Sequence, residues 1–170
     1  LVVEMAGRAS VIPYGMAALS HGMDFAVSPT SAFVAAERFV QLQRLAVEKG
    51  CKLIIPPGAL GGIDALGAAA RLDIEWVEHR ITKPAKAWQG TRAVQMVDLD
   101  QITEPTVIFS DSARAAADAF PQNANVAVIT ALAGIGLDQT RVTLVADPDV
   151  GSNLHEIAAR GAFGTMQLRF

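Results

Sequence analysis

The chain has 170 residues, of which 51% are hydrophobic and 18% are charged, so it can bury a core and is unlike disordered chains. The net charge is −3 and the basic residues are scattered, which excludes a basic stripe for nucleic acid. No apolar run approaches the ~20 residues that span a bilayer, and the start lacks a secretory pattern. We therefore expect a cytoplasmic protein with no membrane or nucleic-acid partner. The single cysteine, Cys51, excludes an internal disulfide and a cysteine zinc site.

The first part of the chain alternates between strand and helix patterns. Strands separated by helices with short connections indicate a parallel α/β unit. The predicted elements are strands at Leu1–Glu4, Asp24–Val27 and Lys52–Ile55, and helices at Val11–His21 and Phe33–Gly50. No G-x-G-x-x-G motif occurs. We therefore expect residues 1–55 to be the second part of a Rossmann-type dinucleotide-binding domain whose Gly-rich portion is absent.

The remaining residues are richer in strands. The predicted elements are a helix through Ala70, a strand at Ile74–Thr82 closed by a Lys83–Pro84 turn, a strand at Thr106–Ser110, a helix over 112–120 capped by Ser110 or Asp111, a helix at Asn125–Ala133, and strands at Arg141–Ala146, Leu154–Arg160 and Phe163–Phe170. This order favours an α+β domain with a mixed, largely antiparallel sheet. We expect residues 56–170 to be a catalytic and dimerisation domain of this kind.

Three kinds of polar side chain are candidates for chemistry. His155 lies in a polar segment, and an imidazole titrates near neutral pH, so it can take a proton or activate water. Asn123 and Asn125 precede an apolar helix, where an Asn can cap the helix, meet a polar ligand, or do both. Lys83 and Arg80 are candidates for binding substrate carboxylates, with a solvated strand end as the alternative.

The other polar residues give weaker indications. Asn153 precedes His155 by two residues, so on a strand it would share a face with it and could orient substrate or cap a turn. His21 at a helix end and His79 in an alternating strand are interpreted as structural or surface residues. No His, Asp or Glu cluster has metal-ligand spacing, so no metal is predicted.

Three longer stretches carry a resemblance to a known family. They are IPPGALGGIDAL (55–66), FPQNANVAVITALAGIGLDQTRV (120–142) and ADPDVGSNLHEIAARGAFG (146–164), the last with an N-x-H-x-I element at Asn153–Ile157. Their order and spacing are similar to the L-aspartate dehydrogenase family, and the resemblance covers nearly the whole chain. Two positions depart from the family pattern: Pro57 replaces a usual Ser, and Ser31 replaces a usual Gly.

The resemblance implies a reaction and a set of residues. The reaction is reversible oxidative deamination of L-aspartate with NAD or NADP to iminosuccinate, which water hydrolyses to oxaloacetate and ammonia. His155 matches the family's active-site histidine. The cofactor contacts implied are Ala32, Gly58, Ala59 and Asn125.

The substrate contacts stay open, with Lys83, Asn153 and Asn123 as the candidates. The resemblance also implies a homodimer, for which a broad apolar sheet face is a plausible surface. Two alternatives remain: a truncated, non-catalytic module that dimerises through its sheet, and a related reductase acting on another amino or oxo acid. The sequence does not choose between NAD and NADP, because the residues that read the ribose lie in the Gly-rich portion.

Overall fold

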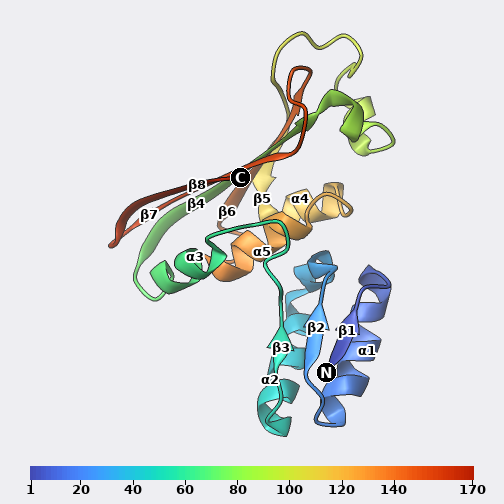
Figure 1. Cartoon of the computed structure of the whole chain (residues 1–170), viewed down its shortest axis with the longest axis vertical. Coiled ribbons are helices and arrows are strands. Elements are labelled where there is room, and N and C mark those ends of the chain that lie inside the picture. The colour runs from blue at the N-terminus through green and yellow to red at the C-terminus, as the bar shows by residue number, and fades with distance from the viewer. The chain divides into compact units, whose positions relative to one another are not determined.

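The chain forms two compact units, Leu1–Ala59 and Leu60–Phe170, in a computed structural model that describes residues 1–170 (Figure 1). Each unit is built around a sheet of its own. The division into a domain of residues 1–55 and a domain of residues 56–170 remains a prediction, because compact units need not be domains that fold independently. No helix in either unit is both long enough and apolar enough to cross a membrane.

The first unit is a parallel α/β unit, as predicted. Its sheet has the order β1-β2-β3, and both pairings are parallel. The elements are β1 (Val2–Glu4), α1 (Val11–Ser20), β2 (Phe25–Val27), α2 (Ala36–Lys49) and β3 (Leu53–Ile54), with 3-10 turns at Arg8–Ser10 and Thr30–Val34. Helix α1 packs tightly on β2, since a Cβ added at Gly15 would lie 2.8 Å from the Phe25 ring.

The predicted start of the second helix at Phe33 is wrong. Thr30–Val34 forms a buried 3-10 segment, and α2 begins only at Ala36. Ala35 interrupts the two with an extended ψ of 85°. The Phe33 ring still packs against that of Phe39, with the two ring centroids 4.8 Å apart.

The second unit is an α+β unit with a five-stranded mixed sheet, which confirms the predicted fold class. The strand order is β5-β6-β4-β7-β8, and only the β4–β6 pairing is parallel. The elements are α3 (Ile63–Ala69), β4 (Ile74–Pro84), β5 (Thr106–Ser112), α4 (Ala113–Ala119), α5 (Asn125–Ala133), β6 (Thr140–Asp147), β7 (Leu154–Gly161) and β8 (Gly164–Arg169), with 3-10 turns at Ala85–Trp88 and Arg92–Gln95.

Helices α3, α4 and α5 lie on one face of this sheet (Figure 1). Alternation along the strands directs apolar side chains toward them, such as Val77 and Ile81 of β4 and Ile157 of β7, which are at most 1% exposed. Helix α5 is buried along most of its length. The core of this unit therefore lies between α5 and the central strands.

Strand β4 runs further than predicted. Its pairing with β6 continues through Lys83 to Pro84, while its pairing with β7 stops at Thr82. Proline is tolerated at this last position because the side that lacks an N–H no longer faces a partner strand. The predicted Lys83–Pro84 turn is thus wrong, and Lys83 is a strand residue.

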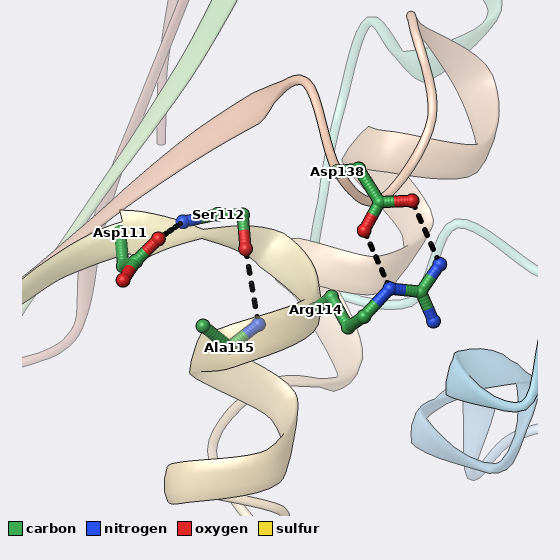
Figure 2. A network of polar contacts seen from close by, with 5 residues as sticks. All are labelled: Asp111, Ser112, Arg114, Ala115 and Asp138. Atoms are coloured by element: carbon green, nitrogen blue, oxygen red, sulfur yellow. Dashed lines mark hydrogen bonds and ion pairs between the residues drawn. The ribbon is translucent and has the colours of Figure 1, made fainter.

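Helix α4 begins at a different cap from the one predicted. Ser112 accepts a hydrogen bond from the backbone N–H of Ala115 at 3.2 Å, whereas Asp111 accepts one from the N–H of Ser112 (Figure 2). Arg114 in the first turn makes a two-pronged ion pair with Asp138 (Figure 2). This pair connects α4 to the turn that precedes β6.

The sheet face away from the helices is polar. Glu156 lies 4.0 Å from Arg80 and 3.7 Å from Arg169, and Arg160 lies 3.3 Å from Glu75. A hollow of about 580 Å³ lies along β4, β7 and β8, and charged or polar residues make up most but not all of its lining: Glu78, Arg80, Glu156, Gln167 and Arg169, with Ile157, Ala158 and Leu168. The expectation of a broad apolar sheet face is therefore wrong.

Candidate active site

His155 lies on β7 and faces the helices. It pairs with Ile81 of β4 on one side and exchanges two backbone hydrogen bonds with Phe170 on the other, at 3.2 and 3.0 Å. Its side chain is only 6% exposed. The central position in the sheet holds the imidazole in one place, which suits a group that must meet a reacting atom.

His79 lies beside His155. The sequence interpretation missed this contact between the two histidines. The His79 Nε2 atom is 3.2 Å from His155 Nδ1, and His79 itself is fully buried. The two residues are diagonal neighbours across β4 and β7, since His79 pairs with Ile157. His79 was interpreted as a structural or a surface residue, and the surface interpretation is wrong. Its burial could have been predicted, because it alternates along the strand with the apolar residues Val77 and Ile81.

Lys83 lies on the same face of β4, at the end of the strand. Its Nζ donates a hydrogen bond to Asn123 Oδ1 at 2.6 Å and lies 5.2 Å from the centroid of the Trp88 ring. No carboxylate forms an ion pair with it. A half-buried ammonium with an amide and an aromatic ring as its partners still lacks a counter-ion.

Burial and a neighbouring positive charge favour the neutral form of His155. Burial, and then the positive charge of Lys83, lower the pKa of His155 below its ordinary value near 6.5. Burial also lowers the pKa of Lys83. A neutral imidazole at the working pH can accept a proton, so His155 has the protonation state that a general base needs.

Neither Asn123 nor Asn125 caps helix α5. The cap position is Ala124, and no side chain caps the helix there. Asn123 instead holds Lys83, and Asn125 is the first residue of α5 and is half-buried. The structural alternative considered for these residues is therefore not what the fold uses.

A small cavity lies beside Asn123. It has a volume of about 210 Å³ and is lined by Asn123, Arg92 and the chain around Phe120. Arg92 forms no ion pair, so it is a second cation without a counter-ion close to the amide that holds Lys83. The sequence interpretation missed Arg92, which carries no recognisable motif.

Two other candidates are not brought to this cluster by a contact. Asn153 is exposed just before β7, and its side chain makes no hydrogen bond within the chain. Arg80 lies on the polar face of the sheet, paired with Glu156. Because Arg80 and Lys83 are an odd number of residues apart on one strand, they face opposite ways. Arg80 therefore matches the alternative of a solvated strand residue, and Lys83 remains the candidate for a substrate carboxylate.

The loop that contains the clustered glycines packs on β8. A Cβ at Gly61 would lie 2.7 Å from the Phe170 ring, and one at Gly62 would lie 2.9 Å from Leu168. These two glycines therefore allow close approach to the strand next to His155. The predicted cofactor residues Gly58 and Ala59 lie just before them, at the end of the first unit.

The remaining predicted cofactor residue, Ala32, lies in the buried 3-10 segment after β2. Nearby in this unit, at the carboxyl end of β1, Glu4 accepts hydrogen bonds from Ala6 N–H and Gly7 N–H through Oε1. Its other oxygen, Oε2, is buried without a partner. Nucleotides bind outside the carboxyl ends of parallel strands, and a free carboxylate oxygen there fits a ribose hydroxyl.

These features define a protein that pairs a Rossmann-type α/β unit with an α+β unit carrying a neutral histidine and unpaired cations. Comparison with known proteins agrees with this class. A family described as "Aspartate dehydrogenase, C-terminal" matches residues 64–170. The chain therefore belongs to the aspartate dehydrogenase family.

Individual relatives show how much of such a protein the chain spans. It is 71% identical over 170 residues to an L-aspartate dehydrogenase of Brucella anthropi, covering all of this chain and 63% of that protein. It is 41% identical over 169 residues to an L-aspartate dehydrogenase of Ruegeria pomeroyi, covering 99% of this chain and 62% of that one. The crystal structure of aspartate dehydrogenase from Thermotoga maritima superposes with a TM-score of 0.86 at 27% identity, covering 99% of this chain and 67% of that chain.

Proposed function

We propose that the protein acts as an L-aspartate dehydrogenase, converting L-aspartate and NAD⁺ or NADP⁺ to iminosuccinate, which water hydrolyses to oxaloacetate and ammonia. The observation that carries the proposal is a neutral His155 next to Lys83, an ammonium without a counter-ion. Such a site offers a proton acceptor beside a carboxylate-binding cation. The names of the relatives support the same reaction.

His155 is the proposed general base. It takes a proton from the substrate ammonium, which breaks an N–H bond of the substrate and forms one on the ring, and it then releases this proton to solvent. The neutral ring can afterwards take a proton from the water that attacks the imine. Lys83 and Arg92 are the proposed partners of the two aspartate carboxylates, with Asn123 holding the Lys83 ammonium in position. Asn153 is a further proposed substrate contact.

The proposed cofactor contacts are Ala32, Gly58, Ala59 and Asn125. When bound, the nicotinamide accepts the hydride from the substrate carbon. The unpartnered Oε2 of Glu4 supports a ribose hydroxyl near β1, so the residues present fit such a cofactor. The choice between NAD and NADP belongs to residues that read the ribose elsewhere in a complete dinucleotide-binding fold.

We also propose that the protein is a homodimer. The alternative is a non-catalytic module that dimerises through its sheet. The only observation in favour of that alternative is the five-stranded sheet itself, which both hypotheses require. A related reductase with another amino or oxo acid differs from the proposal in substrate alone, and its carboxylate partners would be the same kind of cation.

The assay joins this chain to the parts of the Brucella anthropi relative that it does not span. L-Aspartate with NAD⁺ or NADP⁺ should then produce reduced cofactor, followed by its absorbance. His155→Ala should lower kcat by about 10²–10⁴-fold, the usual contribution of a general base. Lys83→Met and Arg92→Met should mainly raise the KM for aspartate.

His21→Ala is the matched control, because His21 is an exposed histidine at the end of α1. It should leave turnover unchanged. Absence of turnover in the joined wild-type protein would refute the proposal, as would a fully active and folded His155→Ala variant. Faster turnover of a different amino acid would favour the related reductase.

A further inference from the structure

A chain of hydrogen bonds runs from helix α5 to the imidazole of His155. Thr130 of α5 donates its hydroxyl hydrogen to the carbonyl oxygen of Val126 at 3.1 Å. The Thr130 Oγ1 atom is also 2.9 Å from His79 Nδ1, and His79 Nε2 is 3.2 Å from His155 Nδ1. His79 and Thr130 are both fully buried, and His155 is 6% exposed.

The donor and the acceptor of each hydrogen bond follow from the carbonyl group of Val126, where this series of hydrogen bonds ends. The Val126 carbonyl can only accept, so the single hydroxyl hydrogen of Thr130 is used there, as is common for threonine within a helix. Thr130 Oγ1 must then accept from His79, which places a proton on His79 Nδ1. A neutral His79 has no second N–H, so its Nε2 accepts a hydrogen bond from His155 Nδ1.

The opposite direction makes one hydrogen bond fewer. If Thr130 donated to His79 instead, the hydroxyl would lose its bond to Val126. His79 would then donate from Nε2 to His155, and His155 would carry its proton on its own Nε2. In that state His155 has no free lone pair, because Nδ1 is occupied by the hydrogen bond from His79.

We propose that His79, itself held by Thr130, is a positioning residue that fixes His155 as the Nδ1–H tautomer and so leaves His155 Nε2 free to accept the substrate proton. This rests on the proposed function only for the role of His155. The ring nitrogen that reacts is determined by the hydrogen bond at the other one. The N–H bond that breaks on the substrate is replaced by one at Nε2, and the Nδ1 proton stays in place.

The burial of His79 makes this arrangement stable across the working pH range. Burial, and to a smaller extent His155, lower the pKa of His79 to about 3. His79 is therefore neutral and keeps an acceptor at Nε2 even after His155 has gained its proton. The positive charge then stays on His155, where the reverse step needs it.

The first test reads the tautomers directly, without substrate. Protein labelled with ¹⁵N-histidine is examined by two-bond ¹H–¹⁵N correlation spectra, with His21→Gln to assign the third histidine. His79 and His155 should both show the Nδ1–H pattern. An Nε2–H pattern at His155 would overturn the proposal.

The second test changes the end of the hydrogen-bond chain. Thr130→Val removes the acceptor for His79 Nδ1, so His155 should shift toward the Nε2–H tautomer. In the joined enzyme described above, kcat should fall about tenfold or more with little change in KM, since a base in the wrong tautomer is a poor base. Thr130→Ser should restore both readings.

Thr140→Val is the matched control. Thr140 is as fully buried as Thr130, but its hydroxyl has no partner. Its loss should leave the tautomers and kcat unchanged. Equal effects of the two Val variants, or unchanged spectra in Thr130→Val, would refute the positioning role. The spectra decide this role even if aspartate is not turned over, so the two proposals can fail separately.

Discussion

The buried imidazole of His79 affects stability as well as chemistry. Its pKa is about 3 in the folded chain and near the ordinary value of 6.5 when unfolded. Between these values the unfolded chain binds a proton that the folded chain does not. The contribution of His79 is therefore fully present above about pH 6.5 and is lost as the pH falls toward 3.

Replacing His79 should reduce this pH dependence. We expect the free energy of unfolding of the wild-type chain to fall by about 1 kcal/mol per pH unit below pH 6.5 from this one group, and the slope to become shallower in His79→Gln. Urea denaturation at a series of pH values measures it. A smaller slope should remain, because the pKa of His155 is also lowered.

The control for this measurement is His21→Gln. His21 is exposed, with Nδ1 2.8 Å from the carbonyl oxygen of Ala17. Its replacement should leave the slope as in the wild type. Parallel curves for wild type and His79→Gln would contradict the buried, neutral His79.

Among the elements, β7 has the tightest steric requirement at a glycine, namely at its last residue, Gly161. A Cβ at Gly161 would overlap the carbonyl oxygen of Asp73 and lie 2.9 Å from Ile74 Cα, both of them backbone atoms. Gly67, inside α3, has open space around it. A side chain is therefore sterically excluded at Gly161, whereas there is room for one at Gly67.

Substitution by alanine should separate them. Gly161→Ala should destabilise the chain by about 1–3 kcal/mol, because the backbone at Asp73, in the loop before β4, must shift. Gly67→Ala should stabilise it by about 0.5–1 kcal/mol through the helix propensity of alanine. Thermal or urea unfolding of both variants tests this, and a neutral Gly161→Ala would show that the loop at Asp73 yields easily.

Most elements could be predicted from the sequence because their signals are local. Alternation and helical spacing located nearly all the strands and helices of both units. The contact of His79 with His155 could not be predicted in this way, since it depends on how β4 and β7 are aligned across 76 residues. The same holds for Lys83, whose strand continues only because β6 pairs with it.

At the scale of the whole molecule, the polar sheet face is one candidate surface for the proposed homodimer. It carries the ion pairs of Glu156 with Arg80 and Arg169. We expect the protein to sediment with a molar mass near twice the 17.9 kDa of the chain. If this face forms the contact, high salt should weaken the dimer, because exposed charge pairs are screened.

Analytical ultracentrifugation at low and high salt measures both quantities. A single-chain mass at all concentrations would contradict the proposed homodimer. A dimer that is insensitive to salt would place the contact on another surface of the chain.

The alignment of β4 with β7 has a consequence for which changes the chain can accept. The only shift in their pairing lies between Ile74 and Trp76, and from there to Thr82 the partners follow one another without interruption. A single residue inserted or deleted in β4 between this bulge and His79 would turn His79 to the outer face and bring Glu78 or Arg80 inward, which would remove the contact of His79 with His155. This region should therefore tolerate many exchanges of side chain on its outer face, but no change in the number of residues between the bulge and the histidine.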